Sequence, residues 1–282
     1  MKARNLLNLL LLLIVIVLIS FTIQTINIKQ TTGKSLLDIK REDIKQITIP
    51  RPQGDIVLNK NNSEWRMSTP YTARAHSFRV NMLLDLIDIA IANSYDINTE
   101  KLKSFGLDTP RASILFNNQA IHFGKQNPVT KQRYIQTEKF ISLINDQIYP
   151  LISSQPSSFV DLKILDSGHL ISGLHLPDFS LLQQDDGHWS LSGKQQASAD
   201  QIQVLLEHWR HAQAFAVHAY LPRKQLGSLV IELDSGKTVE LEISDTSPWL
   251  ILGQKQLGIE YHLDSEMYNR LFRLDQPSAK SE

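Results

Sequence analysis

The sequence predicts an α+β protein in which an N-terminal transmembrane helix precedes two tandem domains, each a mostly antiparallel sheet packed on one main helix. Three observations predict this class. A hydrophobic run stands near the N-terminus, short β-type runs surround one amphipathic helix in the first half, and the second half repeats that order. The predicted division is a cytoplasmic tail at 1–5, an anchor at 6–23, a linker at 24–40, domains at 41–152 and 169–275 with a linker at 153–168 between them, and a flexible tail at 276–282.

The run from Leu6 to Ile23 is the predicted membrane anchor. It has no charged residue, and at about 18 residues it reaches the lower limit for a helix that crosses a bilayer. A cleaved signal peptide is the alternative, but the run is longer than the usual hydrophobic region and no small-x-small cleavage site follows it. Lys2 and Arg4 favour a cytoplasmic N-terminus, against a weaker opposite bias from Lys29 and Lys34. We therefore expect a single-pass protein of a bacterial inner membrane with a periplasmic body.

The first domain is expected to begin with a three-stranded meander. Runs at 44–49, 55–58 and 64–67 are rich in β-forming residues and are separated by proline, glycine and asparagine. Ser77 is a candidate N-cap for the helix that follows. One apolar face of that helix is expected to consist of Val80, Leu83, Leu84, Ile87 and Ile91.

The rest of the first domain is expected to be mainly β. A loop at 105–110 leads into a predicted hairpin over 112–116 and 121–123. Residues 133–135 are expected to form another strand. Residues 140–148, with apolar side chains at helical spacing, are expected to form a short closing helix.

The second half shows the same order of elements. A capping box at Ser198–Gln201 opens a helix, and alternating residues at 229–233 and 238–243 predict the clearest hairpin of the chain. Residues 267–271 are expected to close the domain. The equivalent pairs in this alignment are Trp65 and Trp189, Tyr95 and Tyr220, Gly124 and Gly253, and Tyr134 and Tyr261. A period longer than about 100 residues indicates tandem domains rather than a solenoid.

The first half carries a recognisable combination of motifs. A meander that ends in a tryptophan strand and a capped helix is followed by Phe105-Gly106-Leu107-Asp108-x-Pro110, by a hairpin that ends in Gly124, and by Arg133-Tyr134. This combination resembles the bacterial family called domain of unknown function 4340. The resemblance covers most of 44–152 and more weakly 170–272. The second half lacks the Gly-Leu-Asp-x-Pro loop.

The resemblance implies a protein tethered by one N-terminal helix, without assigned catalytic residues. Some members look like companions of ABC-type export systems related to gliding-motility components. Gly106, Leu107, Asp108 and Pro110 form the best candidate for a partner-binding loop. We nevertheless favour a structural turn, in which Gly106 has a positive φ and Asp108 binds nearby backbone amides.

Other candidate sites are weaker. His208 and His211 lie at i and i+3 of the second helix, a spacing that permits metal ligation, but no H-E-x-x-H arrangement accompanies them. We therefore expect solvated histidines rather than a metal site. Trp65 and Trp189 could stack on a ligand, but their equivalent positions favour two buried core anchors. Asp185-Asp186 before Gly187 is typical of a tight turn.

Composition limits the classes of function. Lys+Arg 29 equals Asp+Glu 29, so no net field favours nucleic acid. The chain has no cysteine, which excludes disulfides, thiolate catalysis and cysteine zinc sites. We expect no cofactor and no catalytic residue.

The leading hypothesis is a non-catalytic, membrane-tethered periplasmic protein that binds or scaffolds an envelope complex. Its expected partners are the lipid bilayer and integral membrane proteins, with an ABC-type transporter as the candidate. One alternative is an envelope hydrolase or metal-dependent enzyme with a site between the repeats. Another is a module that binds a solute or polymer.

Overall fold

The computed structural model describes residues 11, 13, 15, 35–91, 94–97, 99–166 and 168–274. Within these residues, no helix is both long and apolar enough to cross a membrane. The predicted anchor Leu6–Ile23 lies outside the described residues except for Leu11, Leu13 and Val15. The predicted tails at 1–5 and 276–282 also lie outside them.

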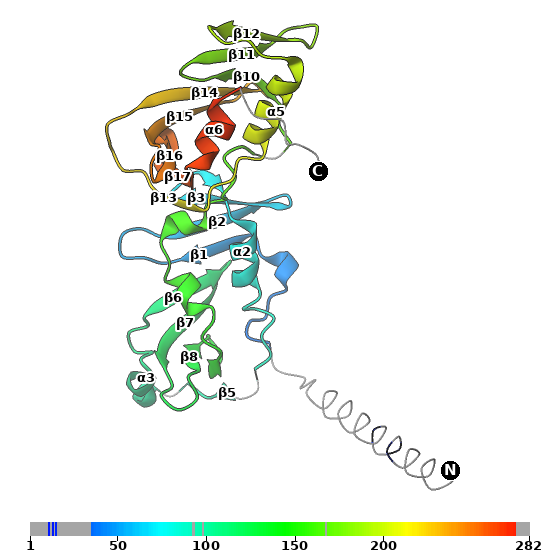
Figure 1. The fold of residues 1–282 in the computed structure, drawn as a ribbon. Coiled ribbons are helices and arrows are strands. Elements are labelled where there is room, and N and C mark those ends of the chain that lie inside the picture. The colour runs from blue at the N-terminus through cyan, green and yellow to red at the C-terminus, as the bar shows by residue number, and fades with distance from the viewer. Residues whose placement is uncertain are drawn as a thin grey trace. The chain divides into compact units, whose positions relative to one another are not determined.

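The described chain folds into two mostly antiparallel sheets with a few helices, which agrees with the α+β class (Figure 1). The hydrogen-bonded order of strands is β4-β3-β2-β1-β6-β7-β8-β9-β5 in the first sheet and β12-β11-β10-β14-β15-β16-β17-β13 in the second. The strands of the first sheet are β1 (Gln46–Ile49), β2 (Ile56–Asn61), β3 (Glu64–Thr69), β4 (Ala73–Arg74), β5 (Ser94–Tyr95), β6 (Ala112–Phe116), β7 (Gln119–Gln126), β8 (Arg133–Gln136) and β9 (Ile141–Ile144).

The second sheet lies entirely in the C-terminal half. Its strands are β10 (Ile171–His175), β11 (Phe179–Gln183), β12 (Trp189–Gly193), β13 (Ala216–Ala219), β14 (Gly227–Leu233), β15 (Thr238–Asp245), β16 (Trp249–Gln254) and β17 (Ile259–Asp264). This order matches that of the first sheet without β4, with β16 in the place of β8 and β17 in the place of β9. The alignment of Gly253 with Gly124 and of Tyr261 with Tyr134 is therefore wrong by one strand.

The chain divides into two compact units. Unit 1 contains Leu84–Ser113 and Gln119–Ile148 together with the segment that ends at Asp43, and unit 2 contains Ile44–Leu83, Ile114–Asn118 and the chain from Tyr149. The division passes through β6. The domain boundaries expected from the sequence stay a prediction.

The first helix is shorter than the apolar spacing predicts. Helix α2 (Ser77–Leu84) ends before Ile87, and a turn follows in which the Ile87 N–H donates to the Leu84 carbonyl at 3.0 Å. Leu86 and Ile87 are both buried, although adjacent residues of a helix point about 100° apart. All five residues of the predicted apolar face are buried, but only those up to Leu84 belong to a helix.

The expected closing helix over 140–148 is wrong for its central residues. Residues 141–144 form strand β9, which pairs with β8 on one side and with β5 on the other. Ile141 and Ile144 stand three residues apart, a spacing that suits a helix. Pairing on both edges satisfies the backbone of this segment without a helix. The helix comes later, as α4 (Tyr149–Ile152).

Helix α5 (Ala199–Arg210) confirms the capping box. The Ser198 hydroxyl accepts from the Gln201 N–H at 3.3 Å, and the Gln201 side chain accepts from the Ser198 N–H at 2.8 Å. Helix α6 (Glu266–Phe272) lies beside α5 (Figure 1). The remaining helical segments are η1 (Arg41–Asp43), α3 (Thr99–Phe105), η2 (Pro156–Phe159) and η3 (Lys255–Leu257).

The tryptophan that anchors the core is not one of the two expected. Trp209 of α5 is fully buried, and its indole N–H donates to the Leu271 carbonyl of α6 at 2.8 Å. Trp65 and Trp189 are of intermediate burial: neither is fully buried in the core, and neither is exposed as a ligand-stacking ring would be. Each lies near a sheet edge, on β3 beside the two-residue β4 and on the edge strand β12, where neighbouring elements provide less cover.

Candidate functional site

The Gly-Leu-Asp-x-Pro loop begins as the C-terminal cap of helix α3. Gly106 has φ +66°, as predicted. The Gly106 N–H donates to the Lys103 carbonyl at 3.2 Å, and the Leu107 N–H donates to the Leu102 carbonyl at 2.9 Å. These two bonds are those of a Schellman motif, which uses a left-handed residue just after the helix. Glycine occupies this position because it has no Cβ to oppose a positive φ.

The loop packs directly on strand β7 at Gly124. A Cβ at Gly124 would lie 2.4 Å from the Phe105 carbonyl oxygen and 3.0 Å from Leu107 Cγ. Leu107 is buried at this contact. Phe105 stacks on Tyr134 of β8 with ring centroids 4.5 Å apart. The motif residues that are separate in the sequence therefore meet in unit 1.

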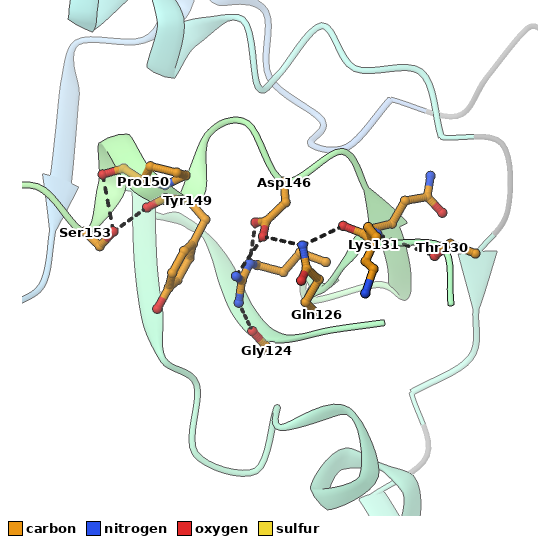
Figure 2. A network of polar contacts seen from close by, with 10 residues as sticks. Gly124, Gln126, Thr130, Lys131, Asp146, Tyr149, Pro150 and Ser153 are labelled. Carbon is orange, nitrogen blue, oxygen red and sulfur yellow. Dashed lines mark hydrogen bonds and ion pairs between the residues drawn. The ribbon is translucent and has the colours of Figure 1, made fainter. Parts of the chain in front are cut away.

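An ion pair joins the first residue of β8 to Asp146, just after β9; Figure 2 shows Asp146 with its neighbours Gly124 and Gln126. The Arg133 side chain, 7% exposed, donates through Nε and Nη2 to the two oxygens of Asp146, the second at 2.8 Å. Its Nη1 donates to the Gly124 carbonyl at 2.6 Å. Gln126 Nε2 donates both to Asp146 Oδ2 at 3.2 Å and to the Lys131 carbonyl at 2.8 Å. A guanidinium that binds a carboxylate with two hydrogen bonds holds a fixed orientation, so this network fixes the backbone at Gly124.

The tip of the loop is exposed. Asp108, Thr109 and Pro110 are all solvent-accessible. The Arg111 N–H then donates to the Phe123 carbonyl at 2.8 Å, which leads the chain into β6. Within the part of the chain that the structure describes, no hydrogen bond of the Asp108 side chain is found, so the expected bonds to nearby amides are not formed. The base of the loop is thus held by packing and backbone hydrogen bonds, whereas its acidic tip is exposed to solvent.

Unit 2 contains a second polar cluster, which no sequence pattern predicted. Glu260 of β17 is fully buried and accepts from Arg223 at 2.8 Å, from His262 Nε2 at 2.8 Å and from the Leu221 N–H at 3.1 Å. Burial favours a higher pKa for Glu260, but the hydrogen bonds from Arg223, His262 and Leu221 outweigh it and lower the pKa below its ordinary value. The carboxylate therefore stays ionised and holds the segment 221–223 on the sheet.

The same segment packs over a glycine, as the loop of unit 1 does. A Cβ at Gly253 would lie 2.8 Å from the Tyr220 ring, and the Tyr220 hydroxyl donates to Glu242 at 2.6 Å. That bond raises the pKa of Tyr220. Leu221 and Arg223, which bind the Glu260 carboxylate, come from a segment about 40 residues earlier in the chain.

The two candidate metal ligands do not converge. His208 Nδ1 lies 3.2 Å from the Arg270 carbonyl, and His211 Nε2 lies 3.3 Å from Glu207 one turn earlier. Among the described residues, no group of three or more histidine, aspartate or glutamate side chains is placed to hold a metal ion. The Asp185-Asp186 segment forms the predicted turn, with Gly187 at φ +85°.

Comparison with known proteins gives one match. A family model described as "Domain of unknown function (DUF4340)" matches residues 65–232. No curated protein and no solved structure matches the chain. The match includes the loop at 106–110, Gly124, the Arg133–Asp146 pair and the polar segment at 220–223.

Proposed function

This chain belongs to the DUF4340 family, and we propose that it is a non-catalytic, membrane-tethered protein that binds or scaffolds an envelope complex. Its hydrophobic segment Leu6–Ile23 would hold it in the inner membrane, with the body in the periplasm. Its partners would be integral membrane proteins, with an ABC-type transporter as the candidate.

The observation that carries this proposal is that the base of the loop at 105–110 is packed on neighbouring strands while its tip is exposed. Its polar and aromatic neighbours are used to hold the loop in place: Phe105 stacks on Tyr134, and Arg133 is committed to Asp146 and Gly124. The exposed tip with Asp108 is accessible for binding to another molecule. Loops that are fixed by a rigid scaffold and exposed at the tip are common positions for binding residues.

We also infer that the two halves are tandem copies of one sheet-and-helix unit. The matching strand order of the two sheets supports this, as does the position of α2 and α5 after the opening meander of each half, with the additional two-residue β4 before α2. In this arrangement the second copy has replaced the Gly-Leu-Asp-x-Pro loop by the segment 220–226, which Glu260 holds in place.

The test is recovery of partners from native membranes. The full-length protein is cross-linked in membranes, purified in mild detergent and analysed by mass spectrometry. Asp108→Lys reverses the charge at the exposed tip, and Glu138→Lys is the matched control because Glu138 is also an exposed carboxylate of unit 1. We expect Asp108→Lys to lose membrane-protein partners that the wild type and the control retain, at unchanged melting temperature. Recovery of the wild type alone, or equal recovery of partners with Asp108→Lys, would contradict the proposal.

A further inference from the structure

Unit 2 contains a pocket of about 190 Å³ that none of the motifs above explains. Its walls come from strands β3 and β4, from the segment 160–169, from the turn between β14 and β15, and from β16, η3 and β17. The four cationic side chains that line it are Arg66, Arg74, Lys163 and Lys237. The two lining carboxylates, Asp161 and Asp166, leave an excess of two positive charges in a protein whose formal net charge is +0.

Arg74 is the fixed element of this pocket. Its side chain is only 12% exposed, its Nη2 donates to the Leu165 carbonyl at 3.2 Å, and its Nε lies 2.9 Å from Asp161 Oδ2. Its Nη1 lies 3.5 Å from Asp166 Oδ1. The two carboxylates therefore hold the guanidinium in a fixed orientation at the wall of the pocket.

The other three cationic side chains of the pocket are more accessible to a ligand than Arg74. Arg66 is the cross-strand neighbour of Arg74 in the β3–β4 pair, and within the described part of the chain it makes one long ion pair, with Asp166 at 3.5 Å. A guanidinium has five N–H donors, so most of those of Arg66 stay free for a ligand. The side chains of Lys163 and Lys237 are exposed. The nearby His169 is directed to Asp234 at 3.5 Å.

The remaining lining is mixed: Thr72, Thr238 and Gln254 are polar, and apolar side chains and one buried phenol hydroxyl complete it. Val160, Val239 and Leu257 line the pocket beside Tyr261, which is 4% exposed. Burial raises the pKa of Tyr261 well above its ordinary value. Its hydroxyl therefore stays protonated and can donate a hydrogen bond to an anion.

We propose that this pocket binds a small organic phosphate monoester, with the phosphate against Arg66, Arg74 and Lys237 and the organic group against Val160, Val239 and Leu257. A phosphate monoester carries about −1.5 to −2 charges at neutral pH, which matches the excess positive charge of the pocket. Paired guanidinium groups suit the geometry of phosphate oxygens. The site is independent of the loop at 106–110, which belongs to unit 1.

Calorimetric titration of the full chain with phenyl phosphate tests the proposal. We expect saturable binding, weakened about tenfold in Arg66→Gln and Lys237→Gln, since each loses a charge-assisted hydrogen bond. Lys224→Gln is the matched control because Lys224 is exposed in the same unit and does not line the pocket. Benzoate and phenol should bind more weakly than phenyl phosphate because they carry one and no negative charge.

Three outcomes would overturn the proposal. One is the absence of saturable heat with phenyl phosphate. Another is equal affinity of Arg66→Gln, Lys237→Gln and the wild type. The last is tighter binding of benzoate than of phenyl phosphate. None of these results bears on the partner test with Asp108→Lys, so the two proposals can fail separately.

Discussion

Replacing Gly124 with alanine adds one methyl group where the loop from α3 crosses strand β7. The new Cβ would lie 2.4 Å from the Phe105 carbonyl oxygen and 3.0 Å from Leu107 Cγ. The first of these atoms belongs to the backbone, so the clash cannot be relieved by rotation of a side chain. It would have to move by about 1 Å to restore ordinary van der Waals contact.

The expected cost follows from the contacts that this movement disturbs. Overpacking of a close-packed site costs about 1–3 kcal/mol. Lifting the loop also weakens the stacking of Phe105 on Tyr134, a kind of contact that contributes about 0.5–1.5 kcal/mol. We therefore expect Gly124→Ala to lower the free energy of unfolding of unit 1 by about 2–4 kcal/mol.

Hydrogen exchange followed by mass spectrometry is the assay, because it reports each segment of the full chain separately. Residues 102–112 and 121–126 should lose protection in Gly124→Ala. Gly227→Ala is the control, since the atoms nearest to a Cβ there are Pro177 Cγ at 3.3 Å, Ile243 Cδ1 at 3.4 Å and Pro177 Cβ at 3.9 Å, all of them side-chain atoms. We expect it to change stability by less than about 1 kcal/mol. Unchanged exchange in Gly124→Ala, or equal losses in both variants, would refute the packing argument.

Three further predictions use residues of unit 2. Arg223→Leu should lower the free energy of unfolding by about 3 kcal/mol because it leaves the buried Glu260 carboxylate without its cation. Adding Glu260→Leu should recover most of that loss. A double variant no more stable than the single one argues against the pairing. The pKa of Glu260 is lowered in the fold, so the stability that its ionised form contributes is complete above its ordinary pKa of 4.5 and is lost as the pH falls through the folded pKa. Denaturation curves should therefore show a smaller loss of stability below pH 4.5 for Glu260→Gln than for the wild type. The chain has no cysteine, so Asp186→Cys at an exposed turn gives a single thiol, and a membrane-impermeant maleimide should label it in intact spheroplasts; labelling only after lysis would contradict the proposed orientation.

Elements with a local cause were predicted well. The capping box at 198–201 opens α5, the alternation at 238–243 lies within β15, and Gly106 has a positive φ. In each case the signal and the structure involve residues only a few positions apart. Caps, alternation and left-handed glycines depend on hydrogen bonds and steric limits within one turn or one strand.

Predictions that depended on neighbours were less successful. Trp65 and Trp189 were expected to be core anchors, and their positions near a sheet edge give them intermediate burial, whereas the fully buried Trp209 was not expected as an anchor. Residues 141–144 had a spacing that fits a helix, yet pairing with β8 and β5 makes them a strand. The matching of Gly253 with Gly124 followed the order of residues and missed the order of strands.

The sequence by itself determined the class of the protein, the order of most of its elements, its family and the loop with Gly106, because periodicity and turn chemistry act over a few residues. Only the tertiary structure decided which distant residues meet. It set Phe105 over Gly124, covered Glu260 with Arg223, and brought Arg66 and Arg74 to the same pocket as Lys237. The physical reason is that burial, and with it the strength of a charge or the cost of a methyl group, belongs to an environment built from several segments of the chain.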